Sequence, residues 1–287
     1  TAVIWKFPVL GQDRTYLLAW TTTPWSTPGT TGLSVGPELT YVKVKSGDEY
    51  YFIVKDRLAD VLRDTPYTVL EEMKGTALVG IKYQPIEASY SQLPEVKDNS
   101  NVYHVFAGDY VNVNEGTGIV TINGSYGEID MQAAQRHQLP LIMDVTMDGT
   151  FNEKSGRYQG KSVDQGQAEL VEQAKQNHLV FRAEPYRHSY PHCWRCDTKL
   201  LNYATTSWFV RVTQLKEDML KNNDQITWVP EHVKQGRFGK WLEGAKDWAI
   251  SRERYWGAPL PIWKSTDGDV LCVGSLAELK QLSGTEV

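Results

Sequence analysis

Short apolar runs separated by turn residues make up most of the first half of the chain. The runs are rich in Val, Ile, Tyr and Phe, whereas Gly, Pro and Asp stand between them, and this arrangement is typical of β-strands. A further run ends at Leu17, Leu18 and Ala19, where three consecutive threonines and Pro24 follow. The predicted strands include residues 3–9, 41–44, 50–54, 67–70 and 77–81.

Three other segments have the spacing of helices. In the first, an apolar stripe at i, i+3 and i+4 follows Asp56, which we expect to be its N-cap. The second is predicted over residues 129–137, with its first turn at about Glu128. In the third, Ser162 and Gln165 are spaced as a capping box ahead of an amphipathic stretch. The first and third patterns predict helices that pack on the core, and no function is assigned to them.

The composition is that of a globular protein, because 41% of the residues are hydrophobic and 23% are charged. No apolar run approaches the roughly 18 residues of a membrane span, and no signal segment opens the chain. Three cysteines are too few for a disulfide framework, so we expect a reducing, cytoplasmic location. Because the chain opens at Thr1, directly before a predicted strand, we expect it to be part of a longer polypeptide.

The net charge of −5 argues against nucleic-acid binding, but the charge is unevenly distributed. Residues 181–264 contain 14 Lys and Arg against 9 Asp and Glu. In the same region, aromatic residues alternate with arginines from Trp208 to Trp263. This pattern is compatible with phosphate contacts and base stacking, and equally with a packed core that has a charged rim.

Thr21, Thr22 and Thr23 place three hydroxyls where the predicted strand ends. Small donor and acceptor groups at the edge of a sheet can hold a polar ligand without a charged side chain. The alternative is an ordinary strand end, because threonine favours strands and proline terminates them.

A second candidate region runs from Gly116 to Asp130. A β run that contains two glycines and leads into a helix is typical of a loop whose backbone approaches something closely. Asp130 falls in the first turn of that helix, where the helix dipole is expected to favour the ionised carboxylate. The alternative reading is structural, since acidic residues are common in first turns.

Cys193 and Cys196 form one C-x-x-C, which is half of a tetrahedral zinc site. A second C-x-x-C is absent from the sequence, so His188 and His192 are the neighbours that could complete the set. Zinc is therefore a candidate cofactor, and the alternative is a reduced thiol pair at a domain joint.

Several strings resemble isoleucyl-tRNA synthetases. T-T-T-P-W-S-T-P, at residues 21–28, and G-T-G-I-V, at residues 116–120, resemble the editing (CP1) domain, the insertion of class I synthetases that hydrolyses misacylated tRNA. D-W-A-I-S-R-E-R-Y-W-G-A-P-L-P-I-W, at residues 247–263, resembles the synthetase body just after that insertion. The valine and leucine relatives carry arginine after the threonine pair, so Thr23 favours the isoleucine branch.

The resemblance implies a mixed α/β fold. A β-barrel-like editing domain with peripheral helices is expected over residues 1–183, followed by a connector and part of a Rossmann-type catalytic domain over residues 184–287. Neither H-I-G-H nor K-M-S-K-S occurs in the chain, and in the family these motifs handle ATP. We therefore expect ATP and magnesium to act only in a full-length enzyme, and no cofactor in the editing site.

The same resemblance implies roles for single residues. Asp130 aligns with the aspartate that holds the ammonium group of the misattached amino acid, and the three threonines would line the wall and orient water. Thr30 and Thr121 stand where the family usually has asparagine and histidine, which contact the terminal ribose and position water. The predicted substrate-binding residues are Trp20, Thr30, Thr121 and Trp256, the last of these near the aminoacyl-adenylate pocket.

The implied function is the removal of misactivated valine from tRNA(Ile), by a monomer that does not associate with a membrane. A second hypothesis is a domain that binds tRNA and has lost hydrolysis through the changes at Thr30 and Thr121. A third is a zinc-containing structural module without a substrate pocket. A valine-type or leucine-type editing domain is the nearest rival within the first hypothesis.

Overall fold

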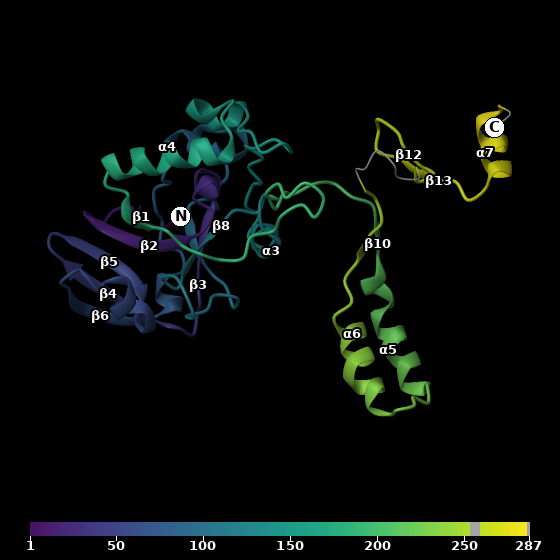
Figure 1. Ribbon diagram of the computed structural model, residues 1–287, viewed down its shortest axis with the longest axis horizontal. Helices are drawn as coiled ribbons and strands as arrows, with labels where there is room; N and C mark the ends of the chain where they lie inside the picture. Colours follow the sequence, from purple (N-terminus) through teal and green to yellow (C-terminus); the bar gives the residue numbers. More distant parts are fainter. Residues whose placement is uncertain (253–258, 286–287) are drawn as a thin grey trace. The chain divides into compact units, whose positions relative to one another are not determined.

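The computed structural model describes residues 1–252 and 259–285. The chain forms two compact units, Thr1–Ala204 and Thr205–Val287, and Figure 1 shows the elements of each. No helix in the described ranges is long and apolar enough to cross a membrane.

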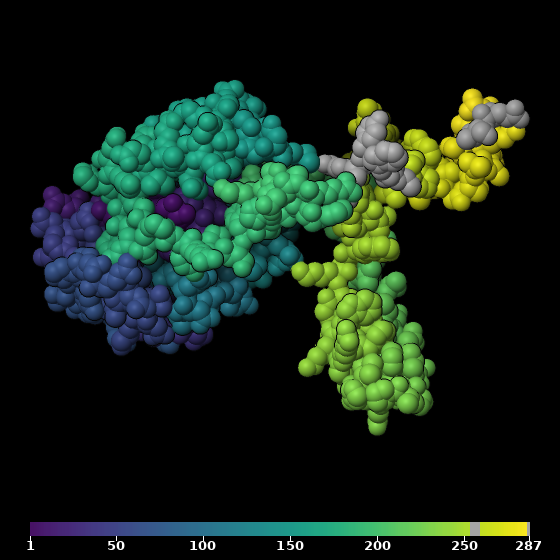
Figure 2. Space-filling model, viewed as in Figure 1, coloured from purple at the N-terminus to yellow at the C-terminus, as the bar shows by residue number. Residues whose placement is uncertain are grey.

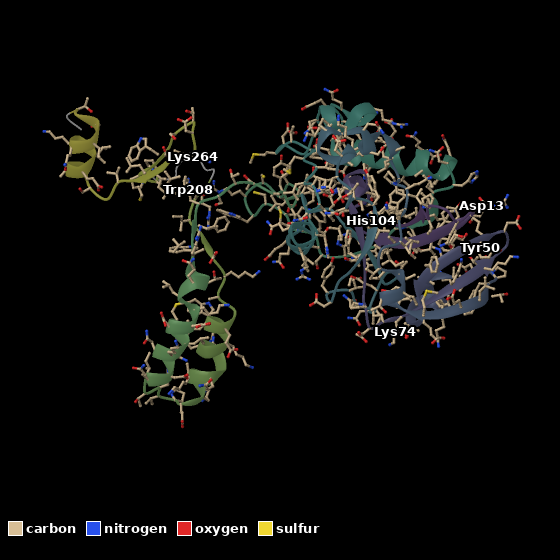
Figure 3. All side chains as sticks on the ribbon, turned by 180° about the vertical axis from the view of Figure 1, so that it is seen from behind. Asp13, Tyr50, Lys74, His104, Trp208 and Lys264 are labelled. Atoms are coloured by element: carbon tan, nitrogen blue, oxygen red, sulfur yellow. The ribbon has the colours of Figure 1, made fainter. Side chains whose placement is uncertain are left out.

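A six-stranded mixed sheet forms the centre of the first unit, in the order β6-β4-β5-β2-β1-β9. The β2–β5 pair is parallel, and the other neighbours are antiparallel. Figure 3 shows Asp13 and Tyr50 close together at one end of this sheet, where the Tyr50 N–H donates to the Arg14 carbonyl at 2.8 Å. The strands are β1 (Ala2–Pro8), β2 (Thr15–Thr21), β4 (Thr40–Ser46), β5 (Glu49–Val54), β6 (Thr68–Lys74) and β9 (Val180–Glu184).

The central strand β1 is buried on both faces. Val3, Trp5 and Phe7 belong to one apolar cluster, and Ile4 belongs to another, as the alternation of side chains along a strand requires. Lys6, on the second face, is buried because its ammonium group donates to Glu49 at 2.7 Å. Hydrophobic burial on both faces therefore stabilises this strand in the interior of the sheet, between β2 and β9.

A smaller sheet carries the second candidate region. Its order is β7 (His104–Ala107), β3 (Gly32–Val35) and β8 (Ile119–Ile122), with β3 parallel to β7 and antiparallel to β8. The short 3₁₀ helix η1 (Pro24–Gly29) joins β2 of the large sheet to β3 of the small one. Pro24, in its first turn, has the φ that a helix start needs. The threonine segment therefore lies where the chain passes between the two sheets.

Short helices complete the first unit: α1 (Leu58–Val61), α2 (Pro94–Lys97), α3 (Glu128–Arg136) and α4 (Val163–Gln176). The predicted capping box at Ser162 and Gln165 is confirmed, as is the helix that begins at Glu128. Asp56 is not an N-cap, because a 3₁₀ turn precedes α1 and Arg57 occupies the cap position without a side-chain bond. The strand predicted over residues 77–81 is also wrong, since a 3₁₀ helix (Gly75–Leu78) covers its first two residues and a turn follows.

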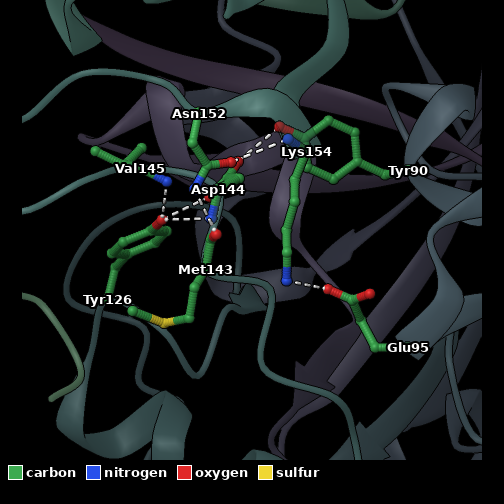
Figure 4. Close-up of polar contacts among 8 residues, drawn as sticks. All are labelled: Tyr90, Glu95, Tyr126, Met143, Asp144, Val145, Asn152 and Lys154. Atoms are coloured by element: carbon green, nitrogen blue, oxygen red, sulfur yellow. Dashed lines mark hydrogen bonds and ion pairs between the residues drawn. The ribbon is translucent and has the colours of Figure 1, made fainter.

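A buried carboxylate organises the loop between α3 and α4 (Figure 4). Asp144 is fully buried and accepts hydrogen bonds from the hydroxyls of Tyr90, at 2.6 Å, and Tyr126, at 2.5 Å. The Tyr126 hydroxyl in turn accepts the N–H groups of Asp144 and Val145. The Tyr126 ring packs edge-on against Trp25 of η1 at 4.8 Å, so this network supports the element that follows the threonines.

The described part of the second unit contains two short antiparallel ribbons and three α-helices. Trp208, labelled in Figure 3, precedes the first ribbon. The α5 and α6 helices lie against each other, and Trp228, after α5, packs against Phe238, directly before α6, with ring centroids 4.8 Å apart. The elements are β10 (Phe209–Val210), α5 (Lys216–Gln225), α6 (Gly239–Glu243), β11 (Trp248–Ala249), β12 (Ile262–Lys264), β13 (Val270–Cys272) and α7 (Leu276–Ser283).

The mixed α/β class is confirmed, but the strands of the first unit do not form a closed barrel. In the described residues the large sheet ends in two edge strands, β6 and β9, which are not paired with each other. The division at residue 183 and the Rossmann-type part stay predictions. The compact first unit continues to Ala204.

Candidate functional site

A cavity of about 290 Å³ lies between the threonine segment and the glycine loop. The end of β2 forms one wall, and the residues that lead into β8 form the other. Asp130, from the first turn of α3, also lines it. Six predicted site residues therefore come together here from three separate parts of the sequence: Trp20, Thr21, Thr22, Thr23, Thr121 and Asp130.

The hydroxyls of the threonine segment form a short chain of contacts. Thr21 Oγ1 lies 3.3 Å from Thr23 Oγ1 and also accepts the Thr23 N–H at 3.1 Å. Thr23 Oγ1 lies 3.3 Å from the hydroxyl of Ser26. Among the described residues, the Thr22 hydroxyl has no hydrogen-bond partner, so it is available to a ligand. The wall therefore offers one free hydroxyl beside two oriented ones.

The cavity lining contains two carboxylates: Glu115, which is exposed and accepts the Tyr186 hydroxyl at 2.7 Å, and Asp130, which is half-buried. Its Oδ2 accepts the N–H of Asn123 at 3.1 Å, and no cation pairs with it in the described residues. Burial raises its pKa from 3.8 to about 6, and the hydrogen bond from Asn123 only partly offsets that rise. The expectation that the helix dipole would favour the ionised form is therefore wrong, because loss of hydration outweighs the dipole.

Asn123 joins the two walls, a role that the sequence analysis missed. Its side-chain amide donates to the Ser26 carbonyl at 2.7 Å, and its oxygen accepts the Ser125 N–H at 3.3 Å. Its backbone N–H holds Asp130. In the sequence, an asparagine directly after a predicted strand was the only indication of this role. Its partner Ser26 is 97 residues away in the sequence, so no local pattern links the two residues.

Two glycines allow the close approach that the sequence predicted. A Cβ on Gly116 would lie 3.1 Å from the ring of Trp20, and a Cβ on Gly118 would lie 2.4 Å from Val54 Cβ. Both have positive φ, at +73° and +71°, a region that favours glycine. The backbone of the loop therefore lies directly against the large sheet and forms the floor of the cavity.

Thr30, another predicted substrate-binding residue, does not line the cavity. Thr30 is 2% exposed and its hydroxyl has no partner among the described residues. Trp256 lies outside the described residues. Their predicted roles stay predictions.

The two cysteines that were predicted as half of a metal site lie in a turn. Residues 193–198 form a turn in which the Asp197 N–H donates to the Cys193 carbonyl at 2.8 Å, and Cys196 Sγ lies 3.2 Å from Thr198 Oγ1. The Nδ1 atoms of His188 and His192 are each bonded to a backbone carbonyl. No group of three or more His, Cys, Asp or Glu in the described ranges is arranged to hold a metal ion. These residues alone therefore do not fit tetrahedral zinc.

Comparison with known proteins identifies relatives along the whole chain. A family model described as "tRNA synthetases class I (I, L, M and V)" matches residues 2–286. Isoleucine–tRNA ligase of Clostridium novyi is 43% identical over 276 residues, which are 96% of this chain and 26% of that protein. The Chlamydia abortus ligase is 42% identical over 292 residues, which cover 100% of this chain and 27% of that protein. The chain thus spans about a quarter of the length of these relatives.

Solved structures resemble the fold. The crystal structure of GlLeuRS-CP1 matches with a TM-score of 0.50 and 14% identity, covering 64% of this chain and 99% of that one. A leucyl-tRNA synthetase editing domain from P. knowlesi matches with a TM-score of 0.46 and 13% identity, covering 63% of this chain and 95% of that one.

Proposed function

Because the chain belongs to the class I tRNA synthetases of the I, L, M and V group, we propose that it forms the editing part of an isoleucyl-tRNA synthetase. In this proposal it hydrolyses valine from misacylated Val-tRNA(Ile). The relatives named isoleucine–tRNA ligase support the choice of amino acid. Charging of tRNA(Ile), with ATP and magnesium, belongs to the longer protein.

The observation that carries the proposal is a half-buried carboxylate, Asp130, in a cavity that threonine side chains and the backbone of the glycine loop also line. An ionised Asp130 without a cation is costly in this position, as its raised pKa shows. The α-ammonium group of an aminoacyl ester is a cation that would pair with it and offset that cost. A carboxylate placed in this way selects an amino acid over a neutral acyl group.

Size explains why such a second site is needed. One methylene changes binding by only about 1–3 kcal/mol, a limit for which isoleucine against valine is the standard example. A separate cavity that admits valine and excludes the larger side chain adds a second selection step. The backbone floor at Gly116 and Gly118 is suited to this, because it cannot move aside as a flexible side chain can.

The hydrolytic step is assigned to a positioned water. The cavity lining contains no Ser, Cys or His in its described residues, so a covalent intermediate on such a side chain is not proposed. The water attacks the ester carbonyl carbon, the ester bond to the terminal ribose breaks, and the ribose oxygen takes up a proton. The threonine hydroxyls orient the water and donate to the developing oxyanion.

Deacylation of Val-tRNA(Ile) by the 287-residue chain tests the proposal. Asp130→Asn keeps the shape and removes the charge, so the rate at pH 7.5 should fall about 10- to 100-fold, which corresponds to a charged hydrogen bond of about 1.5–3 kcal/mol. Asp98→Asn, an exposed carboxylate away from the cavity, is the matched control and should leave the rate unchanged. Equal rates for all three proteins would contradict the proposal.

The alternative, binding without hydrolysis, depends on Thr121. This residue lines the cavity at the position where the resemblance places histidine. If the parent chain binds tRNA(Ile) but does not deacylate it, Thr121→His should restore hydrolysis. A parent that deacylates at a normal rate removes the alternative.

A further inference from the structure

A separate cavity of about 320 Å³ lies beside the C-terminal half of α4. Its walls come from the end of β1, residues 84–88, the 3₁₀ helix η5 (Glu153–Tyr158) and α4, and it shares no lining residue with the Asp130 cavity. Figure 2 shows the teal atoms of the segment that contains α4 at the surface of the first unit. The lining residues Gln84, Arg157 and Asn177 are exposed, so a small molecule has access to the cavity from solvent.

The cavity lining contains a paired carboxylate and guanidinium. Glu87 is 7% exposed, and its Oε1 accepts a hydrogen bond from Arg157 Nη2 at 3.0 Å. The same oxygen accepts the Ser89 hydroxyl at 3.1 Å, and Oε2 accepts the Tyr158 hydroxyl at 3.1 Å. A carboxylate oxygen accepts two hydrogen bonds. Oε2 therefore keeps one acceptor position that no described residue fills.

The guanidinium of Arg157 has several free donors. Its side chain is 46% exposed, and within the described ranges it makes one hydrogen bond, to Glu87. Most of its five N–H donors therefore have no protein partner. The guanidinium carbon lies 5.8 Å from the ring centroid of Tyr158, and this contact together with the ion pair limits the orientations of the group. The pair thus presents one acceptor position and several donors side by side.

The inner wall of the cavity is apolar. It is formed by the buried side chains of Ile86, Leu170, Ala174 and Tyr158, with the half-buried Leu179. The remaining polar lining residues are the neutral amides Gln84, Gln173 and Asn177. An aliphatic group that leaves water for such a wall gains free energy in proportion to its buried area. An apolar wall with a few fixed polar groups is the usual form of a small-molecule site.

We propose that this cavity binds a free aliphatic α-amino acid as a zwitterion. The α-carboxylate accepts the free N–H groups of Arg157, the α-ammonium group donates to Glu87 Oε2, and the side chain lies on the apolar wall. The four charges then alternate in sign, so the ligand extends the existing ion pair and leaves no charge unpaired.

The free carboxylate separates this site from the Asp130 cavity. Under the proposed function the Asp130 cavity takes an amino acid ester, which has an ammonium group and no carboxylate. The Glu87–Arg157 pair requires both charges on the ligand, so it selects the free acid over an ester. The inference therefore does not depend on the proposed function.

Isothermal titration calorimetry of the 287-residue chain with leucine tests the inference. Leucinamide lacks the carboxylate and isocaproate lacks the ammonium group, so each should bind at least about 10-fold more weakly than leucine, the factor for one charged hydrogen bond. Arg157→Gln should weaken leucine binding by at least the same factor. Arg63→Gln is the matched control, because Arg63 is also an exposed, ion-paired arginine and lies outside the cavity lining.

Replacing the buried Glu87 risks unfolding the chain, because its ion-pair partner would lose the charge that it faces. Isocaproate therefore tests the role of Glu87 on the unmodified protein. NMR of the isotope-labelled chain supplies the location, since leucine should shift the Arg157 Nε–H resonance saturably.

Asp130→Asn separates the two cavities and should leave the affinity for leucine unchanged. Leucine binding that is lost in Asp130→Asn and kept in Arg157→Gln would place the ligand in the other cavity and overturn the inference. Equal affinities for leucine, leucinamide and isocaproate, or no saturable binding of leucine, would also overturn it. A parent that binds leucine through Arg157 and does not deacylate Val-tRNA(Ile) would support the inference and contradict the proposed function.

Discussion

Asp130→Asn should make the protein more stable at neutral pH while it removes the proposed activity. The carboxylate is half-buried and has no cation beside it in the described residues, so ionising it in the folded state carries a penalty. The rise of its pKa from 3.8 to about 6 corresponds to about 3 kcal/mol. We expect about 2 kcal/mol in practice, because the side chain is only half-buried and cavity water screens part of the charge.

The pH dependence has a definite sign. Because the folded pKa lies above the unfolded one, the favourable contribution of protonated Asp130 is complete below about pH 3.8 and is lost as the pH rises through about 6. Asparagine is neutral throughout, and its amide oxygen can still accept the Asn123 N–H. The stability difference between Asp130→Asn and the parent should therefore be near zero at pH 4 and about 2 kcal/mol in favour of the variant at pH 7.5.

Urea unfolding of both proteins at pH 4, 5, 6, 7 and 7.5 measures this difference. Other titrating groups cancel in the comparison, and Asp98→Asn corrects for the general effect of removing one negative charge. A variant that is less stable than the parent at pH 7.5 would refute the reasoning. So would a difference that does not change with pH, because the effect would then not come from ionisation of Asp130.

Three further predictions concern the framework around the site. Tyr126→Phe removes a donor from the buried Asp144 and should cost about 1–3 kcal/mol in urea unfolding; a loss no larger than that of Tyr67→Phe, at an exposed tyrosine, would contradict this. Gly118→Ala should lower the free energy of unfolding more than Gly47→Ala does. Both glycines have positive φ, but only a Cβ on Gly118 would clash, at 2.4 Å from Val54 Cβ. Equal losses of stability would contradict this and show that the backbone at Gly118 shifts to accept the methyl group. With two thiolates in reach, the 287-residue chain should hold less than one zinc per molecule by elemental analysis; one full equivalent that disappears in Cys193→Ser would mean that residues outside the described ranges complete the site.

Local patterns account for the elements that the sequence predicted correctly. The capping box at Ser162 and the helix start at Glu128 are formed by residues three or four positions apart, so a short window contains all their partners. The prediction failed over residues 77–81, where the hydrophobic run suits a strand but the chain turns. The Gly75 N–H there donates to the Leu39 carbonyl at 2.9 Å, a contact between distant segments that no local pattern contains.

The sequence by itself determined the pieces of the site: three hydroxyls at a strand end, a glycine loop and a carboxylate in a first turn. Only the tertiary structure decided what they do together. It brought Asp130 to the threonines, joined their walls through Asn123, and buried the carboxylate so that its pKa rises instead of falling. It also brought residues from the 186–203 segment beside Thr22, where together they line a larger cleft. The physical reason is that propensity and capping act over a few residues, whereas burial and through-space contacts depend on residues that are far apart in the chain.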